Sequence, residues 1–251
     1  MANMDLNWRA EEACMSAWPS PRQMLLSGWL LRAAGGSIRR TNSVNPLRGG
    51  PRDPAAILAA AEATYAALGQ AALFRVPSIA AEMEGPLGAS GYAAEGETLT
   101  LFNDLSEWPQ PQSAATRLTP EADGDWLQAR ATLSSADTID SAVFEAMVRS
   151  IMLPRVFAAT RHEGAMVALA YGVLHDSLAV VEAVVTDARW RQRGFGRRTV
   201  GAVLNWAKAA GAGAACLQVV ADNPAALALY RSLGFTKELY RYHYRRKSLP
   251  L

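Results

Sequence analysis

Residues 180–198, with the sequence VVEAVVTDARWRQRGFGRR, carry the clearest chemical signal in this chain. An apolar run typical of a buried strand leads into a basic, glycine-rich turn. Apolar residues at positions 200, 203, 204 and 207 then predict a helix. Backbone N–H groups at a helix start have no intrahelical partner, and the helix dipole makes that end positive. Because glycines allow close approach and arginines at 191, 193, 197 and 198 add charge, we predict a cradle for a pyrophosphate.

Glu182 is a carboxylate within the apolar strand that precedes this turn. The period of two in a strand predicts that it shares a face with Val180 and Val184. A carboxylate in an apolar strand is costly unless it is paired, and burial makes it a stronger base. Two interpretations follow: Glu182 is a general base, or it is a solvent-facing or ion-paired strand residue.

Composition narrows the class of protein. Half of the 251 residues are apolar, which is ample for a core in one or two domains, and the net charge of +2 argues against nucleic-acid binding. The cysteines, Cys14 and Cys216, and three scattered histidines have no metal-ligand or triad spacing, so we expect no metal and an inert Cys216. Without a signal-peptide pattern or an apolar run of roughly 18 residues, we expect a cytoplasmic protein.

The first half is predicted to fold in the order β-β-α-β-α-β after an N-terminal helix. These elements are a helix over 1–20, two strands within 28–47 around Gly35-Gly36, a helix starting at Asp53-Pro54, a strand at 73–76, a helix at 79–89 and a strand at 98–102. Arg39-Arg40 is expected on a solvated face. Trp18, Trp29 and Trp108 are expected in the core or at an interface, where they could line an acceptor pocket.

The second half is predicted to fold in the order β-α-α-β-β-β-α-β-α-β. The elements are strands near 115–119, 156–161, 165–174, 178–186, 215–220 and 237–247, and helices near 121–133, 139–152, 195–210 and 224–233. An antiparallel meander that runs into a β-α-β crossover predicts an α/β (α+β) fold with a mixed, mostly antiparallel sheet flanked by helices.

The first half resembles a shortened copy of the second, with Gly91-Tyr92 in the place of Gly234-Phe235. We therefore predict two tandem modules, residues 1–108 and 115–251. The proline-containing stretch from Ser106 to Ser113 suggests a linker, placed at 109–114.

Three stretches together resemble the GNAT superfamily of acyl-CoA-dependent N-acyltransferases. Residues 191–196, RQRGFG, fit the family's Q/R-x-x-G-x-G/A signature. Residues 184–191 look like its preceding strand, and residues 217–235 look like its second cofactor segment. The resemblance covers roughly 115–247, and the first half looks, more loosely, like the degenerate N-terminal module of tandem GNAT proteins. One departure is Ala188, which stands where a proline is frequent.

The resemblance implies roles for individual residues. Backbone groups of Val184, Val185 and Thr186 would pair with the pantetheine arm as an added strand would. The residues implied at the pyrophosphate are Arg191, Gln192, Arg193, Gly194, Phe195, Gly196 and Arg197. Asn223 and Ala226 would lie beside the pantetheine, and Tyr230 would protonate the departing CoA thiolate. Tyr230 could instead be core packing with Leu227 and Leu233.

These residues predict an acetyl-CoA-dependent N-acetyltransferase, in which an amine attacks the thioester directly in a ternary complex. A backbone N–H polarises the carbonyl, and Glu182 or a water accepts the ammonium proton. The expected acceptor is a small-molecule or peptide amine, and the protein is expected as a monomer or homodimer without nucleic-acid or membrane partners. One alternative is a CoA-binding sensor or protein-interaction module with little turnover. Another is a dinucleotide-binding site with a G-x-G-x-x-G fingerprint, which Thr199 in the third glycine position disfavours.

Overall fold

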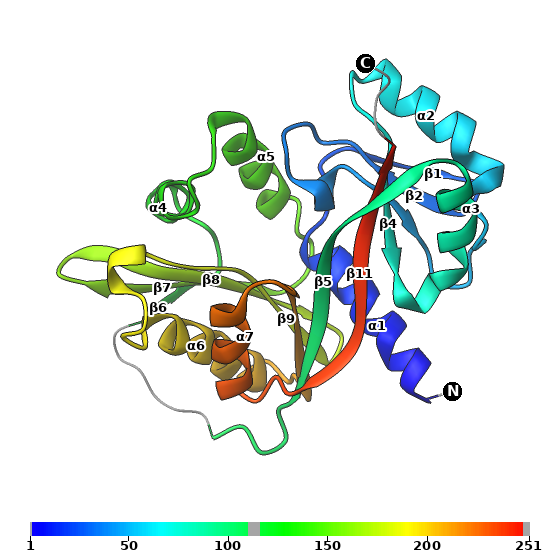
Figure 1. Cartoon of the computed structure of the whole chain (residues 1–251). Helices are drawn as coiled ribbons and strands as arrows, with labels where there is room; N and C mark the ends of the chain where they lie inside the picture. Colours follow the sequence, from blue (N-terminus) through cyan, green and yellow to red (C-terminus); the bar gives the residue numbers. More distant parts are fainter. Residues whose placement is uncertain (1, 110–115, 248–251) are drawn as a thin grey trace.

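The computed structural model describes residues 2–109 and 116–247. Their strands form one eleven-stranded sheet in the order β1-β2-β3-β4-β11-β5-β10-β9-β8-β7-β6. Neighbouring strands are antiparallel except for the parallel pairs β9–β10 and β3–β4. Helices flank this sheet (Figure 1), so the predicted mixed, mostly antiparallel architecture is confirmed.

The second half of the chain follows the predicted order of elements. They are β6 (Thr116–Thr119), α4 (Gly124–Ser134), α5 (Thr138–Arg149), β7 (Arg155–His162), β8 (Ala165–His175), β9 (Leu178–Thr186), α6 (Phe195–Ala209), β10 (Ala214–Val220), α7 (Pro224–Ser232) and β11 (Lys237–Lys247). The side chains of Asp123, Asp137 and Asn223 cap α4, α5 and α7 by accepting a backbone N–H bond from the first turn. Such caps fix where each helix begins.

The first half contains one strand that the sequence did not indicate. Its elements are α1 (Ala2–Ala17), β1 (Gln23–Leu26), β2 (Trp29–Arg32), β3 (Val44–Pro46), α2 (Leu58–Ala67), β4 (Leu73–Pro77), α3 (Glu84–Ala89) and β5 (Tyr92–Asp104). The two strands predicted within 28–47 are β2 and β3, which pair antiparallel. The extra strand, β1, joins β2 through Ser27-Gly28, both with positive φ. Positive φ at both turn residues matches a tight hairpin.

The two halves of the chain share the sheet through exchanged strands. β11 lies between β4 and β5, and β5 also pairs with β10. In Figure 1, β5 and β11 run side by side between the two ends of the molecule. Gly91 and Gly234 have φ of +80° and +90° where the chain leaves α3 and α7, just before these strands. This correspondence supports duplication, while the module bounds 1–108 and 115–251 stay a prediction because residues 110–115 lie outside the described part.

The core fills both faces of the sheet. On one face, α1, α4 and α5 cover a cluster that includes Phe144 and Tyr171. On the other, α6 packs through the predicted stripe Val200, Val203, Leu204 and Ala207, all of which are buried. The approach of α6 to β8 depends on Gly172, where a Cβ would lie 2.4 Å from the Cγ1 of Val203. This close packing holds the middle of α6 against β8.

Candidate active site

A cleft opens where two parallel strands separate. β9 and β10 pair only from Leu178 opposite Ala214 to Val181 opposite Leu217. In the described part of the chain, no strand pairs with residues 182–186 of β9 on the side that faces β10. The start of α6 and one face of α7 close the sides of a cleft of about 470 Å³. A free strand edge beside a helix start can bind an extended chain that ends in an anion.

This cleft brings together every residue predicted to contact the cofactor except Arg193. The predicted residues that line it are Val184, Val185, Thr186, Arg191, Gln192, Gly194, Phe195, Gly196, Arg197, Asn223, Ala226 and Tyr230. Arg193 instead places its guanidinium over the ring of Trp190, 4.7 Å from the centroid. Sequence reasoning missed Trp190, Ala225, Leu229 and Ser232, which also line the cleft. Leu229 could have been inferred, because it lies three residues after Ala226 on the helix, whereas Trp190 had no such signal.

The start of α6 is open toward the cleft. Gln192 and Gly194 adopt positive φ, and no side chain caps the helix at Gly194. A Cβ on Gly196 would lie 3.0 Å from the Oγ1 of Thr186 and 3.4 Å from Leu229, so glycine lets α6 approach β9 and α7. The predicted arginines of this turn are exposed, and in the described residues none of them forms an ion pair. The helix dipole and these charges therefore favour an anion at this point.

Tyr230 of α7 lines this cleft. Tyr230 is 7% exposed, and its ring packs against Phe235. Among the described residues its hydroxyl forms no hydrogen bond with the protein. Burial, and then the negative charge of Glu182, raise the pKa of Tyr230 above its ordinary value. The phenol is therefore protonated at neutral pH and can donate to a group in the cleft.

The prediction that Glu182 shares a face with Val184 is wrong. Tyr171 pairs with Glu182 and Leu169 pairs with Val185, so β9 carries one extra residue between those two positions. Ala183 takes a φ of +50° in this β-bulge. A bulge shifts the alternation of side chains by one position. Glu182 therefore points to the face covered by α1, α4 and α5, whereas Val184 points to the opposite face. Val184 lines the cleft, and Glu182 does not.

Glu182 forms a bidentate ion pair with Arg40 of the first half. The two carboxylate oxygens accept from the Arg40 guanidinium at 2.8 and 2.7 Å. The Glu182 side chain is 4% exposed and that of Arg40 is 19% exposed. The prediction that Arg40 lies on a solvated face is therefore wrong. Arg40 also stacks over Trp18. Burial alone would lower the pKa of Arg40, but Glu182 raises it well above the ordinary value. Of the two interpretations of Glu182, the structure therefore agrees with an ion-paired strand residue.

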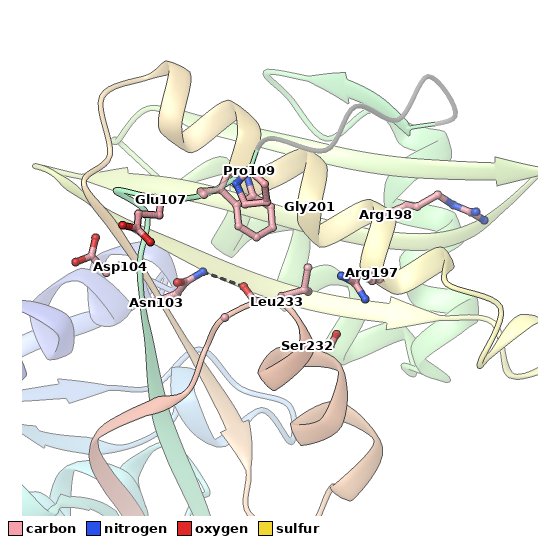
Figure 2. Close-up of a pocket in the computed structure, with 11 residues that line it drawn as sticks. Asn103, Asp104, Glu107, Pro109, Arg197, Arg198, Gly201, Ser232 and Leu233 are labelled. Carbon is pink, nitrogen blue, oxygen red and sulfur yellow. Dashed lines mark hydrogen bonds between the residues drawn. The ribbon is translucent and has the colours of Figure 1, made fainter.

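A second cleft of about 520 Å³ lies beside the first, along α6. It is bordered by the end of β5, the start of α6 and the end of α7 (Figure 2). The side chain of Asn103 donates to the carbonyl of Leu233 at 2.9 Å and holds the end of α7 against β5. Arg197 and Ser232 line both clefts. The two clefts therefore adjoin at the first turn of α6.

In residues 2–109 and 116–247, no group of three or more histidine, cysteine and acidic side chains has the geometry of a metal site. No helix in the same residues has the length and apolar character needed to cross a bilayer.

Comparison with known proteins decides the family. A family model described as "Probable histone acetyltransferase Rv0428c C-terminal" matches residues 8–245. The chain belongs to this family. A protein of Bacillus subtilis (strain 168) described as "Uncharacterized N-acetyltransferase YobR" is 24% identical over 249 residues, which is 97% of this chain and 100% of that relative. The "N-alpha-acetyltransferase RimI" of Mycobacterium tuberculosis (strain ATCC 25618 / H37Rv) is 41% identical over 68 residues, 27% of this chain and 41% of that protein.

Solved structures share the fold of this family member. A GCN5-related N-acetyltransferase from Kribbella flavida superposes with a TM-score of 0.69 at 16% identity, covering 98% of this chain and 96% of that one. A tandem GNAT protein from the clavulanic acid biosynthesis pathway gives a TM-score of 0.63 at 13% identity, covering 83% and 76%. The chain is thus a GNAT-superfamily acetyltransferase, and the relatives support N-acetyl transfer as its activity.

Proposed function

We propose that this Rv0428c C-terminal family member transfers an acetyl group from acetyl-CoA to an amine by direct attack in a ternary complex. The observation that supports this most is the cleft between the separated ends of β9 and β10. It is lined by the unpaired edge of β9, the uncapped start of α6 and the phenol of Tyr230. These are the features that a thioester on a long pantetheine arm with a pyrophosphate requires.

In this proposal the pyrophosphate of the cofactor binds at the first turn of α6. Backbone N–H groups there, with Arg191 and Arg197 beside them, supply hydrogen bonds and positive charge. The pantetheine arm lies along Val184 to Thr186, where β9 has no partner toward β10. Because Arg197 and Ser232 line both clefts, we place the nucleoside end of CoA in the second cleft.

The acetyl group then lies near the bulge in β9. A backbone N–H of β9 polarises its carbonyl, and the amine attacks from the face covered by α1, α4 and α5. Tyr230 donates its proton to the departing CoA thiolate. The Glu182 carboxylate stays a candidate base, but both of its oxygens already accept from Arg40, so we propose that a water carries the ammonium proton away.

The experiment that tests the cofactor site compares two substitutions of Gly194 by calorimetry with acetyl-CoA. Gly194 has positive φ, and a Cβ there would meet nothing within 4 Å. Asparagine and aspartate both tolerate positive φ and have nearly the same shape, so Gly194→Asn is a matched control for Gly194→Asp. A carboxylate at the helix start repels the pyrophosphate, and we expect G194D to bind roughly tenfold more weakly than G194N.

Equal affinities of the two variants would refute the pyrophosphate assignment. Thiol release from acetyl-CoA, measured against a panel of amines, then tests transfer itself. Tight binding without release for every amine would favour the alternative, a CoA-binding sensor. The observation that favours this alternative is the ion pair between Glu182 and Arg40, because it engages the one carboxylate of β9 that could act as a base.

A further inference from the structure

A separate cleft of about 730 Å³ lies between α4 and α5, on the face of the sheet opposite α6 and α7. Small and polar side chains form most of its wall, and Phe144 lies among the lining residues. Phe144 is 1% exposed, and its ring lies 6.4 Å from that of Tyr171 and 5.6 Å from that of Trp18. This cleft therefore reaches the aromatic cluster beneath the two helices.

Arg130 of α4 presents an unpaired cation to this cleft. Its guanidinium lies 3.7 Å above the ring of Phe144. Its Nη1 atom is buried and has no hydrogen-bond partner, and the guanidinium forms no ion pair with any described residue. Burial lowers the pKa of Arg130 from its ordinary value. The contact with the Phe144 ring offsets part of the lost hydration, but a buried Nη1 atom without a hydrogen-bond acceptor is uncommon in proteins.

Other arginines withdrawn from solvent in this protein have partners. Arg75 pairs with the buried carboxylate of Glu11, and Arg40 pairs with Glu182. Arg32 donates to the carbonyls of Trp18 and Met15 at 3.0 and 2.9 Å. Each of these guanidinium groups therefore has an acceptor for at least one of its terminal nitrogens, although the Nε atom of Arg32 has none, whereas no hydrogen bond to a described residue holds the terminal nitrogens of Arg130.

Two carboxylates of α5, those of Glu145 and Asp140, accept hydrogen bonds from residues other than Arg130. Glu145 of α5 lines the same cleft, but it accepts from the Nε and Nη2 atoms of Arg149 at 3.0 and 2.7 Å. Asp140 accepts from the backbone N–H of Ser37 at 2.7 Å and from the Ser37 hydroxyl. Since Glu145 pairs with Arg149, no carboxylate of the described residues forms an ion pair with Arg130, and an anion in the cleft could pair with it directly.

The cleft lies on the same side of the sheet as the position where an amine would meet the acetyl group. Ala183 and Val185, at the bulge of β9, pack against the cluster that contains Phe144, as do Leu127 and Leu133 of α4. Burial, and then the charge of Glu182, raise the pKa of Tyr171, whereas the charges of Arg40 and Arg130 oppose this rise. The Nε1–H group of Trp18, buried in the same cluster, also lacks an acceptor.

We propose that the amine acceptor carries a carboxylate, and that Arg130 binds this carboxylate in the cleft between α4 and α5. A single guanidinium with two free N–H donors matches one carboxylate in a bidentate pair. The acceptor is then an amino acid or an acidic peptide whose amine end is directed toward β9. The inference that this acceptor is acetylated rests on the proposed function, whereas the binding of the carboxylate does not.

The test uses pairs of ligands that differ only in the carboxylate. Nα-acetyl-lysine and Nα-acetyl-lysinamide have the same amine, as do glycyl-glutamate and glycyl-glutamine. Calorimetry on the full chain with CoA present should give tighter binding of the acid in at least one pair, by roughly ten- to hundredfold, as expected for a desolvated charge-assisted pair. In Arg130→Met this preference should vanish, while Arg130→Lys should retain part of it.

The double variant Glu145→Gln, Arg149→Gln is the matched control, because it removes an ion pair that lines the same cleft and leaves the net charge unchanged. It should leave the preference unchanged. The proposal is overturned if neither acid binds better than its amide, or if R130M and this double variant reduce the preference equally. Binding that is selective for the acid without any CoA release would uphold the cleft and refute acetyl transfer, so the two failures are distinguishable. Preserved acetyl-CoA affinity and an unchanged circular dichroism spectrum show that R130M is folded.

Discussion

Replacing Arg40 by methionine tests how the first half of the chain supports the candidate active site. The substitution keeps most of the apolar stem and removes the guanidinium, leaving the Glu182 carboxylate at 4% exposure without a partner. Removing one partner of a buried ion pair typically costs about 3–5 kcal/mol. Because the Arg40 side chain is 19% exposed and water can reach Glu182 once it is gone, we expect the lower end, about 3 kcal/mol.

The assay is urea or thermal unfolding of wild type, R40M, E182Q and the double variant. A loss of about 3 kcal/mol corresponds to a fall in Tm of roughly 10 °C for a chain of this size. E182Q should cost less, because Arg40 keeps a hydrogen bond to the carbonyl of Cys14 at 3.3 Å. The double variant should be more stable than R40M, since no buried carboxylate remains. R40M within 1 kcal/mol of wild type, or a double variant less stable than R40M, would refute the reasoning.

Three further outcomes are expected. Tyr230→Phe should lower kcat by roughly 100-fold while changing stability and acetyl-CoA affinity little, since the deleted hydroxyl has no partner in the described residues; an unchanged kcat would return Tyr230 to a packing role. The pKa of Tyr230 is raised, so the phenol keeps its proton as pH rises, and kcat should show no fall attributable to this group below about pH 10; a falling limb below that pH that disappears in Y230F would contradict this. Gly172→Ala should cost about 1–3 kcal/mol in urea unfolding because its Cβ would lie 2.4 Å from Val203, whereas Gly213→Ala, with nothing within 4 Å, should be nearly neutral; equal effects would show that α6 can shift.

The sequence was sufficient for the elements whose signals are local. The apolar stripe of α6, the start of α7 after Asn223 and the glycines after α3 and α7 all lie where the pattern indicates. Most of the residues predicted to bind the cofactor line one cleft, because they come from one continuous stretch of β9 and α6 together with α7, while their role in binding stays a prediction. Periodicity and capping are properties of neighbouring residues, so they can be read without knowing the tertiary structure.

The features that were missed depend on contacts between distant residues. The bulge at Ala183 is fixed by pairing with β8, and without it the period of two places Val184 on the same face as Glu182. Arg40 lies next to Arg39 in sequence and resembles a solvated pair, yet it reaches Glu182 across the boundary between the two halves. Such long-range pairings leave no periodic trace in the residues that form them.

The position of β11 has a consequence for the order of events during synthesis. Residues 237–247 fill the space between β4 and β5, so these two strands of the first half cannot take their final neighbours before that strand has left the ribosome. Until then β4 and β5 each carry an unpaired edge, which is the kind of edge that associates with other chains. The first half is therefore expected to be prone to association with other chains until β11 has been inserted between β4 and β5 and β10 has paired with the other edge of β5.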